Sequence, residues 1–120
     1  MILLDSNIII YCLHPEFQGV RDFLKGKVLS CSIISKIEVL GYYKLNHAEK
    51  SAFEMLFSQI QIIPLSQNVA FEAIKLRQQQ RITLGDSIIA ATALLAGGAL
   101  ITANVKDFKR ISNLNIINPL

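Results

Sequence analysis

The sequence holds 120 residues, a length typical of one domain, and we expect residues 1–120 to form a single one. Hydrophobic side chains make up 52% of the residues and charged ones only 18%, which excludes a disordered chain. The formal net charge of +3 favours weak attraction to polyanions, but the positive residues are scattered, so charge alone indicates no partner.

Targeting and membrane segments are not expected. Residues 1–5 carry no basic leader, and the longest nearly uncharged stretch, 88–101, is shorter than a bilayer span. Cys12 and Cys31 lie in apolar stretches without the spacing of a metal or redox motif. We interpret them as reduced, buried thiols of a cytoplasmic protein, with a single disulfide as the alternative.

Short apolar runs alternate with segments of helical periodicity along the whole chain. The runs predict strands at 2–4, 28–31, 60–65, 99–102 and 115–117. Helices are predicted at 7–13, 16–25, 35–45, 48–58, 66–80 and 86–96, with a short one from about 106. The helix at 86–96 is apolar nearly all round, which predicts that it is buried.

The strands are continuous apolar runs and do not alternate between polar and apolar residues, which is typical of strands buried on both faces. The expected fold class is therefore α/β, a three-layer α/β/α sandwich around a parallel sheet of five strands. In such sheets function lies at the carboxyl ends of the strands, where the strand order reverses.

Four acidic residues occupy those positions. Asp5 follows the first strand, Glu38 lies in the helix after the second, Asp86 opens the buried helix, and Asp107 opens the short helix after the fourth strand. The other acids lie on polar faces of amphipathic helices. Glu38 and Asp86 are flanked by apolar residues, which predicts carboxylates on largely buried segments.

Each of these acids also has an explanation as a helix cap. Residues 35–38 fit the Ser-x-x-Glu capping box, residues 83–86 and 104–107 are looser versions of it, and Asp5 has the residue type of an N-cap. An acid in a first helical turn gains from the helix dipole.

A second interpretation joins the four acids into one site. If strands one and four are neighbours, Asp5 and Asp107 converge, and Asp86 lies on the helix that leads into strand four. Carboxylates placed that close raise each other's pKa, and a divalent cation relieves the repulsion. A site of oxygen ligands without His or Cys favours Mg²⁺ or Mn²⁺. Such ions support water attack on a phosphodiester.

Four motifs surround these acids in chain order: Leu3-Leu4-Asp5-Ser6-Asn7, Ser35-x-x-Glu38, Gly85-Asp86-Ser87-Ile88-Ile89-Ala90-Ala91-Thr92-Ala93 and Leu100-Ile101-Thr102-Ala103-Asn104-x-x-Asp107-Phe108. Together they resemble the PIN-domain family, most closely the VapC-type toxins of toxin–antitoxin pairs. The resemblance implies strand order 3-2-1-4-5, metal-dependent endoribonuclease activity, a homodimer and an inhibitory antitoxin.

By motif position, the resemblance makes Asp5, Glu38, Asp86 and Asp107 the metal-binding acids. Ser6, Asn7, Thr102 and Asn104 become polar residues that support them. Asn104 stands where some family members carry a further acid, so the sequence leaves open whether one or two metals bind.

Basic and apolar residues around the acids suggest partners. Lys36, Lys44, Lys106, Lys109 and Arg110 lie in segments that adjoin the acids, where they either contact RNA phosphates or only keep the surface soluble. The helices between residues 35 and 58 carry more apolar side chains than one sheet face needs. This excess predicts a groove for a partner helix or a dimer, unless it all packs internally.

The sequence therefore predicts a cytoplasmic Mg²⁺- or Mn²⁺-dependent endoribonuclease, the toxin of a toxin–antitoxin pair, with RNA as its substrate and no membrane contact. The alternative is a catalytically inactive PIN-like module that binds RNA or a protein, with the acids acting mainly as caps.

Overall fold

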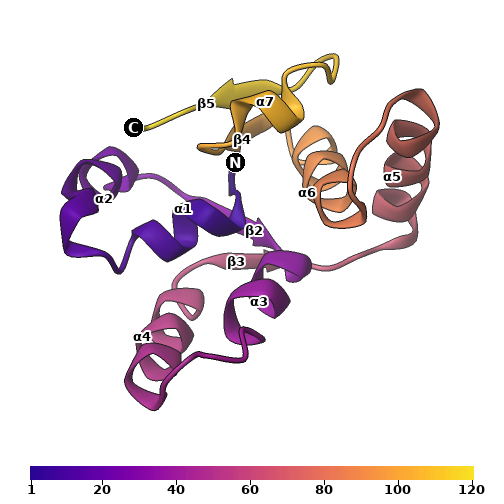
Figure 1. The fold of residues 1–120 in the computed structure, drawn as a ribbon. Coiled ribbons are helices and arrows are strands. Elements are labelled where there is room, and N and C mark those ends of the chain that lie inside the picture. The colour runs from indigo at the N-terminus through magenta and orange to yellow at the C-terminus, as the bar shows by residue number, and fades with distance from the viewer.

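The computed structural model describes all residues from 1 to 120, and it contains one sheet of five strands (Figure 1). Its order is β3-β2-β1-β4-β5, and every neighbouring pair is parallel. The strands are β1 (Ile2–Leu4), β2 (Leu29–Ser32), β3 (Gln61–Ile63), β4 (Ala99–Ile101) and β5 (Asn115–Ile117). The predicted fold class and strand order are confirmed.

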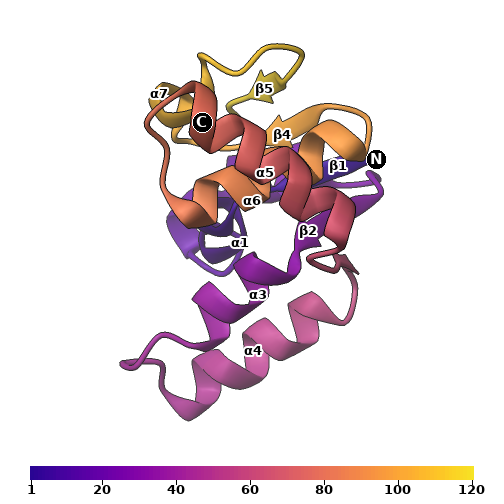
Figure 2. The same cartoon turned by 90° about the vertical axis from the view of Figure 1, so that its right-hand side faces the viewer.

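The helices cover both faces of the sheet. They are α1 (Ser6–Tyr11), α2 (Gln18–Leu24), α3 (Ile33–Leu40), α4 (His47–Phe57), α5 (Gln67–Gln79), α6 (Leu84–Leu95) and α7 (Val105–Phe108), with a short 3-10 helix at Pro15–Phe17. Figure 1 shows α1 to α4 on one side of the sheet and α5 and α6 on the other. After a turn of 90°, α3 and α4 are seen to project as a pair from the rest of the molecule (Figure 2).

The central strands form the middle of two separate cores. Leu4 and Ile101 pack with the buried side chains of α1 to α4, whereas Leu3 and Leu100 pack with those of α5, α6 and α7. All four side chains are at most 1% exposed. Apolar residues at consecutive positions of β1 and β4 are thus explained, because successive side chains of a strand point to opposite faces.

Helix α6 is buried as its composition predicted. Every residue from Ser87 to Ala93 is buried, and the helix packs between the sheet and α5. The hydroxyl of Thr92 donates a hydrogen bond of 2.7 Å to the carbonyl of Ile88, so its polar atom is satisfied inside the core. No helix of the structure is long and apolar enough to cross a membrane.

Helix α3 differs from the prediction at both ends. It begins at Ile33, because the side chain of Ser32 accepts a hydrogen bond from the backbone N–H of Ile34 and caps it. It ends at Leu40 and does not continue to residue 45. A Cβ atom on Gly41 would lie 2.5 Å from the carbonyl oxygen of Ile37, so only glycine fits at this end.

The two cysteines are unpaired, as expected. Cys31 is fully buried and Cys12 is half-buried. Burial raises the pKa of both thiols, that of Cys31 to about 11. Both therefore stay protonated at neutral pH and are packing residues.

Candidate active site

Asp5 lies where β1 and β4 end side by side. One carboxylate oxygen, Oδ1, accepts a hydrogen bond of 2.8 Å from the N–H of Ser6, and the other, Oδ2, accepts one of 2.7 Å from the Thr102 hydroxyl. Thr102 Oγ1 in turn accepts from the N–H of Asn104 at 2.9 Å. Asp5 is 4% exposed. Asp5 is the N-cap of α1, as the capping interpretation predicted, and the Thr102 hydroxyl fixes its other carboxylate oxygen.

Ser6 connects α1 to α3. Its Oγ lies 3.0 Å from Ser35 Oγ and 2.7 Å from Glu38 Oε1. Because a hydroxyl has one proton, Ser6 donates to the carboxylate and accepts from Ser35. Ser35 is fully buried, so Glu38 is anchored from inside the protein through Ser6.

The capping box predicted at residues 35–38 is wrong. Ser35 is the third residue of α3, and its hydroxyl points to Ser6 because Ser32 already caps the helix. The predicted burial around Glu38 is also wrong. Glu38 is exposed, and its neighbour Ile37 is 60% exposed, because this face of α3 looks outward.

Asp86 is the third residue of α6, and it is half-buried. Thr83 caps the helix by accepting a hydrogen bond of 3.2 Å from the N–H of Asp86. A Cβ atom built on Gly85 would lie 3.8 Å from Glu38 Oε2, so the first turn of α6 approaches the Glu38 carboxylate. The predicted cap at residue 83 is thus present.

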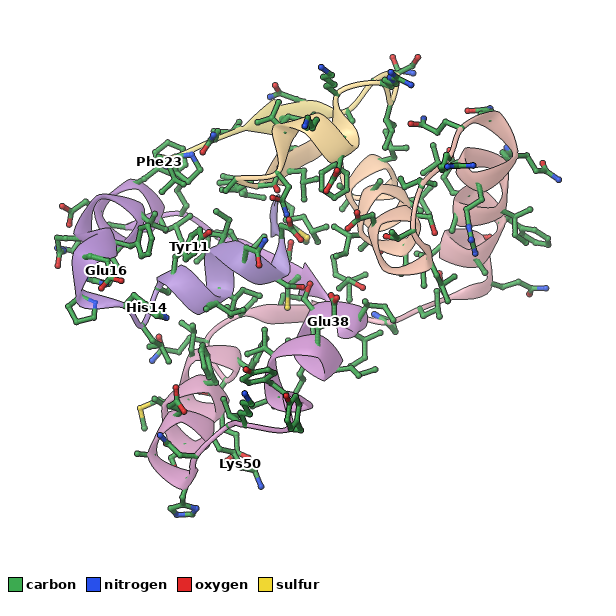
Figure 3. All side chains as sticks on the ribbon, viewed as in Figure 1. Tyr11, His14, Glu16, Phe23, Glu38 and Lys50 are labelled. Carbon is green, nitrogen blue, oxygen red and sulfur yellow. The ribbon has the colours of Figure 1, made fainter.

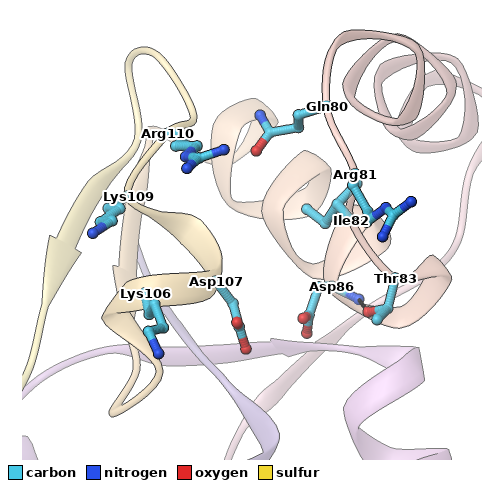
Figure 4. A pocket seen from close by; sticks show the side chains of 9 residues that line it. All are labelled: Gln80, Arg81, Ile82, Thr83, Asp86, Lys106, Asp107, Lys109 and Arg110. Atoms are coloured by element: carbon cyan, nitrogen blue, oxygen red, sulfur yellow. Dashed lines mark hydrogen bonds between the residues drawn. The ribbon is translucent and has the colours of Figure 1, made fainter.

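Asp107 is an exposed residue of the short helix α7. Figure 4 shows its carboxylate and that of Asp86 directed toward the same space. The predicted cap of this helix is absent, because the Asn104 side chain makes no capping hydrogen bond. Asn104 and Asn7 form no side-chain hydrogen bonds, so of the four predicted supporting residues only Ser6 and Thr102 hold an acid through a side chain.

Two of the four acids, Asp5 and Asp86, have raised pKa values to which the charges of the other acids contribute. Burial raises the pKa of Asp5 against the hydrogen bonds from Thr102 and Ser6, and the charges of Glu38 and Asp107 raise it further. Burial also raises the pKa of Asp86, and Asp5, Asp107 and Glu38 add to the rise. No Lys, Arg or His forms an ion pair with any of the four. Their negative charges are therefore left without a cationic side chain.

The donors of the site suit a hard divalent cation. All are carboxylate or hydroxyl oxygens, which Mg²⁺ and Mn²⁺ prefer, and the repulsion between the acids is what such an ion would relieve. As placed, no three His, Cys, Asp or Glu side chains stand close enough together to enclose an ion. Mg²⁺ keeps several waters and binds through one or two carboxylates, so an open arrangement of acids fits it.

Two different surfaces adjoin the acids. The α6–α7 pocket, of about 450 Å³, is lined by Asp86 and Asp107 together with Gln80, Arg81, Ile82, Thr83, Lys106, Lys109 and Arg110. The α3–α4 groove, of about 260 Å³, is mainly apolar and is lined by Ile10, His14, Glu38, Val39, Tyr42, Leu45, Glu49 and Phe53. Figure 3 shows Glu38 near the start of α1 and His14 just beyond its end. The predicted apolar groove thus exists, between α1, α3 and α4.

Comparisons of the sequence and of the structure with known proteins agree on the family of this chain. The profile of the PIN domain family matches residues 2–114. Ribonuclease VapC2 of Rickettsia felis is 29% identical over 97% of this chain and 96% of its own length. Ribonuclease VapC10 of Mycobacterium tuberculosis is 32% identical over 95% of this chain and 90% of its own.

Solved structures agree over the whole chain. A toxin–antitoxin complex from Klebsiella pneumoniae contains a chain that is 31% identical, with a TM-score of 0.85 and coverage of 100% of this chain and 98% of that one. VapBC2 of Rickettsia felis, solved bound to a DNA fragment from its promoter, matches with 27% identity, a TM-score of 0.85 and 98% coverage of both chains.

This chain therefore belongs to the PIN domain family, in its group of VapC ribonuclease toxins. The matched residues 2–114 include all four acids.

We predict that Asp86→Asn stabilises the protein at neutral pH when no metal is present. The folded state binds the Asp86 proton more tightly than the unfolded chain does, whose pKa is near 3.8. The free energy of unfolding therefore falls as the pH rises from 3.8 through the raised folded-state pKa. The variant lacks this loss, so in EDTA its melting temperature should exceed that of the unsubstituted protein at pH 7 and equal it at pH 3.

Asp22→Asn, which changes an exposed acid of α2, is the matched control and should show no such pH-dependent gain. If Asp86→Asn melted lower at pH 7, the favourable effect of the helix dipole would outweigh the repulsion, and Asp86 would be a cap alone.

Proposed function

We propose that Asp5, Glu38, Asp86 and Asp107 bind Mg²⁺ or Mn²⁺ and that this site hydrolyses phosphodiester bonds within RNA chains. The observation that carries the proposal is the convergence of four acids without a cationic partner, where the charges of Glu38 and Asp107 add to the burial that raises the pKa values of Asp5 and Asp86. Acids that served only as helix caps would not need to lie close enough to raise one another's pKa values.

The residues take different parts in this proposal. A bound divalent cation lowers the pKa of water and neutralises charge on the phosphoryl oxygens. Asp5 has both oxygens hydrogen-bonded, so it keeps a fixed position and orients the site. The carboxylates of Asp86 and Asp107 form no ion pair and face one space, so they can bind an ion or accept a proton from the attacking water (Figure 4).

Thr102 and Ser6 are positioning residues in this proposal. Each uses a hydroxyl to fix one carboxylate, Thr102 that of Asp5 and Ser6 that of Glu38. Loss of partners that orient metal ligands typically costs about 10–100-fold in metal affinity or activity.

The cleavage test uses a labelled pool of structured RNA and the purified protein in Mn²⁺. We expect cleavage that EDTA abolishes. Asp86→Asn should reduce it by more than about 100-fold, because loss of a ligand exceeds the loss of its orienting partner. Asp22→Asn is again the matched control and should cleave normally, since Asp22 lies exposed on α2. If Asp86→Asn cleaved RNA as fast as the unsubstituted protein, the proposal that the four acids form the catalytic site would be wrong.

Binding of Mn²⁺ separates this function from an inactive PIN-like module. An ion that binds only the folded state stabilises it by about 2.7 kcal/mol at 100 times its Kd. We therefore expect the melting temperature to rise with Mn²⁺ concentration, and the rise to be lost in Asp5→Asn. Absence of both cleavage and any thermal response to Mn²⁺ would favour the binding module.

We further propose that an antitoxin occupies the α3–α4 groove. Similar chains were solved in toxin–antitoxin complexes, from Klebsiella pneumoniae among others. The groove is apolar along its length and carries Glu38 and Glu49 on its walls. The groove therefore suits an amphipathic segment of the antitoxin. A basic residue on that segment could pair with Glu38, which lines the groove.

Tyr42→Glu tests this assignment, because Tyr42 lines the groove, is 52% exposed and takes no part in the acid site. A charge there should abolish inhibition by the co-expressed antitoxin and leave RNA cleavage unchanged. Tyr43→Glu is the matched control, since Tyr43 is 84% exposed and does not line the groove. Equal loss of inhibition in both variants would contradict the groove as the docking site.

A homodimer in the cytoplasm completes the proposal. Phe71 and Ile74 lie one turn apart on α5 and are 57% and 52% exposed, which is costly for a monomer in water. Contact with a second copy of the chain would cover both side chains and remove that cost. Light scattering of the purified protein measures its mass and tests for the dimer.

The proposed location is the cytoplasm, where RNA is available and where unpaired thiols such as Cys12 stay reduced.

A further inference from the structure

The α6–α7 pocket contains an unusual share of the positive charge of the protein. Arg81 lies on the segment that leads into α6, and Lys106, Lys109 and Arg110 lie on α7 and the residues after it. These are four of the twelve Lys and Arg residues of the chain. Only two acids, Asp86 and Asp107, face the same cavity, so its formal charge is positive.

None of these four cations has a partner in the protein. All four are exposed, and none takes part in an ion pair or a side-chain hydrogen bond. Figure 4 shows Asp86 and Asp107 at one end of the pocket and Arg110 and Gln80 at the other. Lys106 lies beside Asp107 at the acid end, so unpaired positive charge extends from the acids to Arg110 at the other end of the pocket (Figure 4).

The two cavities beside the acids differ in the charge of their linings, and Lys and Arg residues line only the α6–α7 pocket. The α3–α4 groove is instead lined by apolar residues and by Glu38 and Glu49, and its one basic group is His14. Of the five basic residues that the sequence suggested as phosphate contacts, Lys36 and Lys44 do not line the pocket, whereas Arg81, which the sequence analysis did not name, does. A polyanion is thus attracted to one flank of the site.

We propose that the α6–α7 pocket binds the sugar-phosphate backbone of the RNA substrate on one side of the bond that is cut. This rests on the proposed function and adds the path of the strand. Lys106, next to Asp107 in sequence, contacts the phosphate nearest the acids, and Arg110 and Lys109 contact those farther along. Arg81 closes the pocket from the α6 side. Arginine suits this role because its planar guanidinium donates two parallel hydrogen bonds to a phosphate.

Contacts of this kind have a measurable signature. They do not read bases, so removing them weakens binding to all sequences alike. Each phosphate contact on a single strand contributes about −0.7 to the slope of log Kobs against log salt concentration, which amounts to about fivefold in affinity at 0.1 M salt. Removal of all four cations is expected to reduce the slope by about 2.8.

The experiment measures fluorescence anisotropy of a labelled single-stranded RNA of mixed sequence with the full chain in EDTA, so that no cleavage occurs. Arg81→Gln, Lys106→Gln, Lys109→Gln and Arg110→Gln are made singly and together. Arg77→Gln and Lys25→Gln are the matched controls, because both residues are exposed and lie outside the pocket. We expect each pocket variant to bind about fivefold more weakly at 0.1 M salt with a reduced salt slope, and the controls to bind as the unsubstituted protein does.

The outcomes separate this proposal from the nuclease function. In one outcome, the combined pocket variant binds RNA as the unsubstituted protein does, while the unsubstituted protein cleaves RNA in Mn²⁺. That result would overturn RNA binding by the pocket and leave the proposed nuclease function standing. Weakened binding in a protein that neither cuts RNA in Mn²⁺ nor is stabilised by Mn²⁺ would support RNA binding in the pocket and overturn the nuclease function. Displacement of the RNA by poly-glutamate of equal charge at equal concentration would also overturn the assignment, because the ligand would then be an acidic polypeptide.

Discussion

The parallel pairing of β1 with β4 is the constraint on which the site depends. Its register places Leu4 beside Ile101, and the N–H of Asp5 donates to the Ile101 carbonyl at 2.9 Å. The next residues, Asp5 and Thr102, then meet at the end of the sheet, and the Thr102 hydroxyl binds the buried carboxylate. A carboxylate that is nearly excluded from water is tolerated there because the backbone N–H of Ser6 and this hydroxyl replace the lost hydration.

The remaining acids are brought to this point by elements from both layers of helices. Glu38 comes from α3 on one face of the sheet, whereas Asp86 and Asp107 come from α6 and α7 on the other. Each belongs to a well-packed element, since Val39, Ile88 and Phe108 beside them are buried. The two cores therefore hold in place acids whose charges raise the pKa values of Asp5 and Asp86, and a cation bound as proposed would relieve that repulsion.

The continuous apolar strands predicted the parallel sheet with helices on both faces, and the resemblance of four motifs to the PIN-domain family implied the strand order. The sequence predicted the start of α3 poorly. Ser32 and Ser35 are three residues apart, both precede apolar helical residues, and the spacing of Ser35 to Glu38 imitates a capping box. Only the fold shows that Ser32 caps the helix, which leaves the Ser35 hydroxyl to bind Ser6. The apolar neighbours of Glu38 likewise predicted burial, although Ile37 faces solvent.

The acids thus lie between two surfaces of opposite character. Glu38 belongs to the apolar groove between α1, α3 and α4, whereas Asp86 and Asp107 belong to the basic pocket between α6 and α7. If an antitoxin binds in the groove and RNA in the pocket, as proposed, the two approach from different sides and compete only at the acids. Inhibition then needs no overlap along the rest of either surface. In the proposed arrangement, a basic residue of the antitoxin beside Glu38 would neutralise the charge that a bound cation would otherwise neutralise. It would also oppose the effect of the Glu38 charge, which raises the Asp5 pKa.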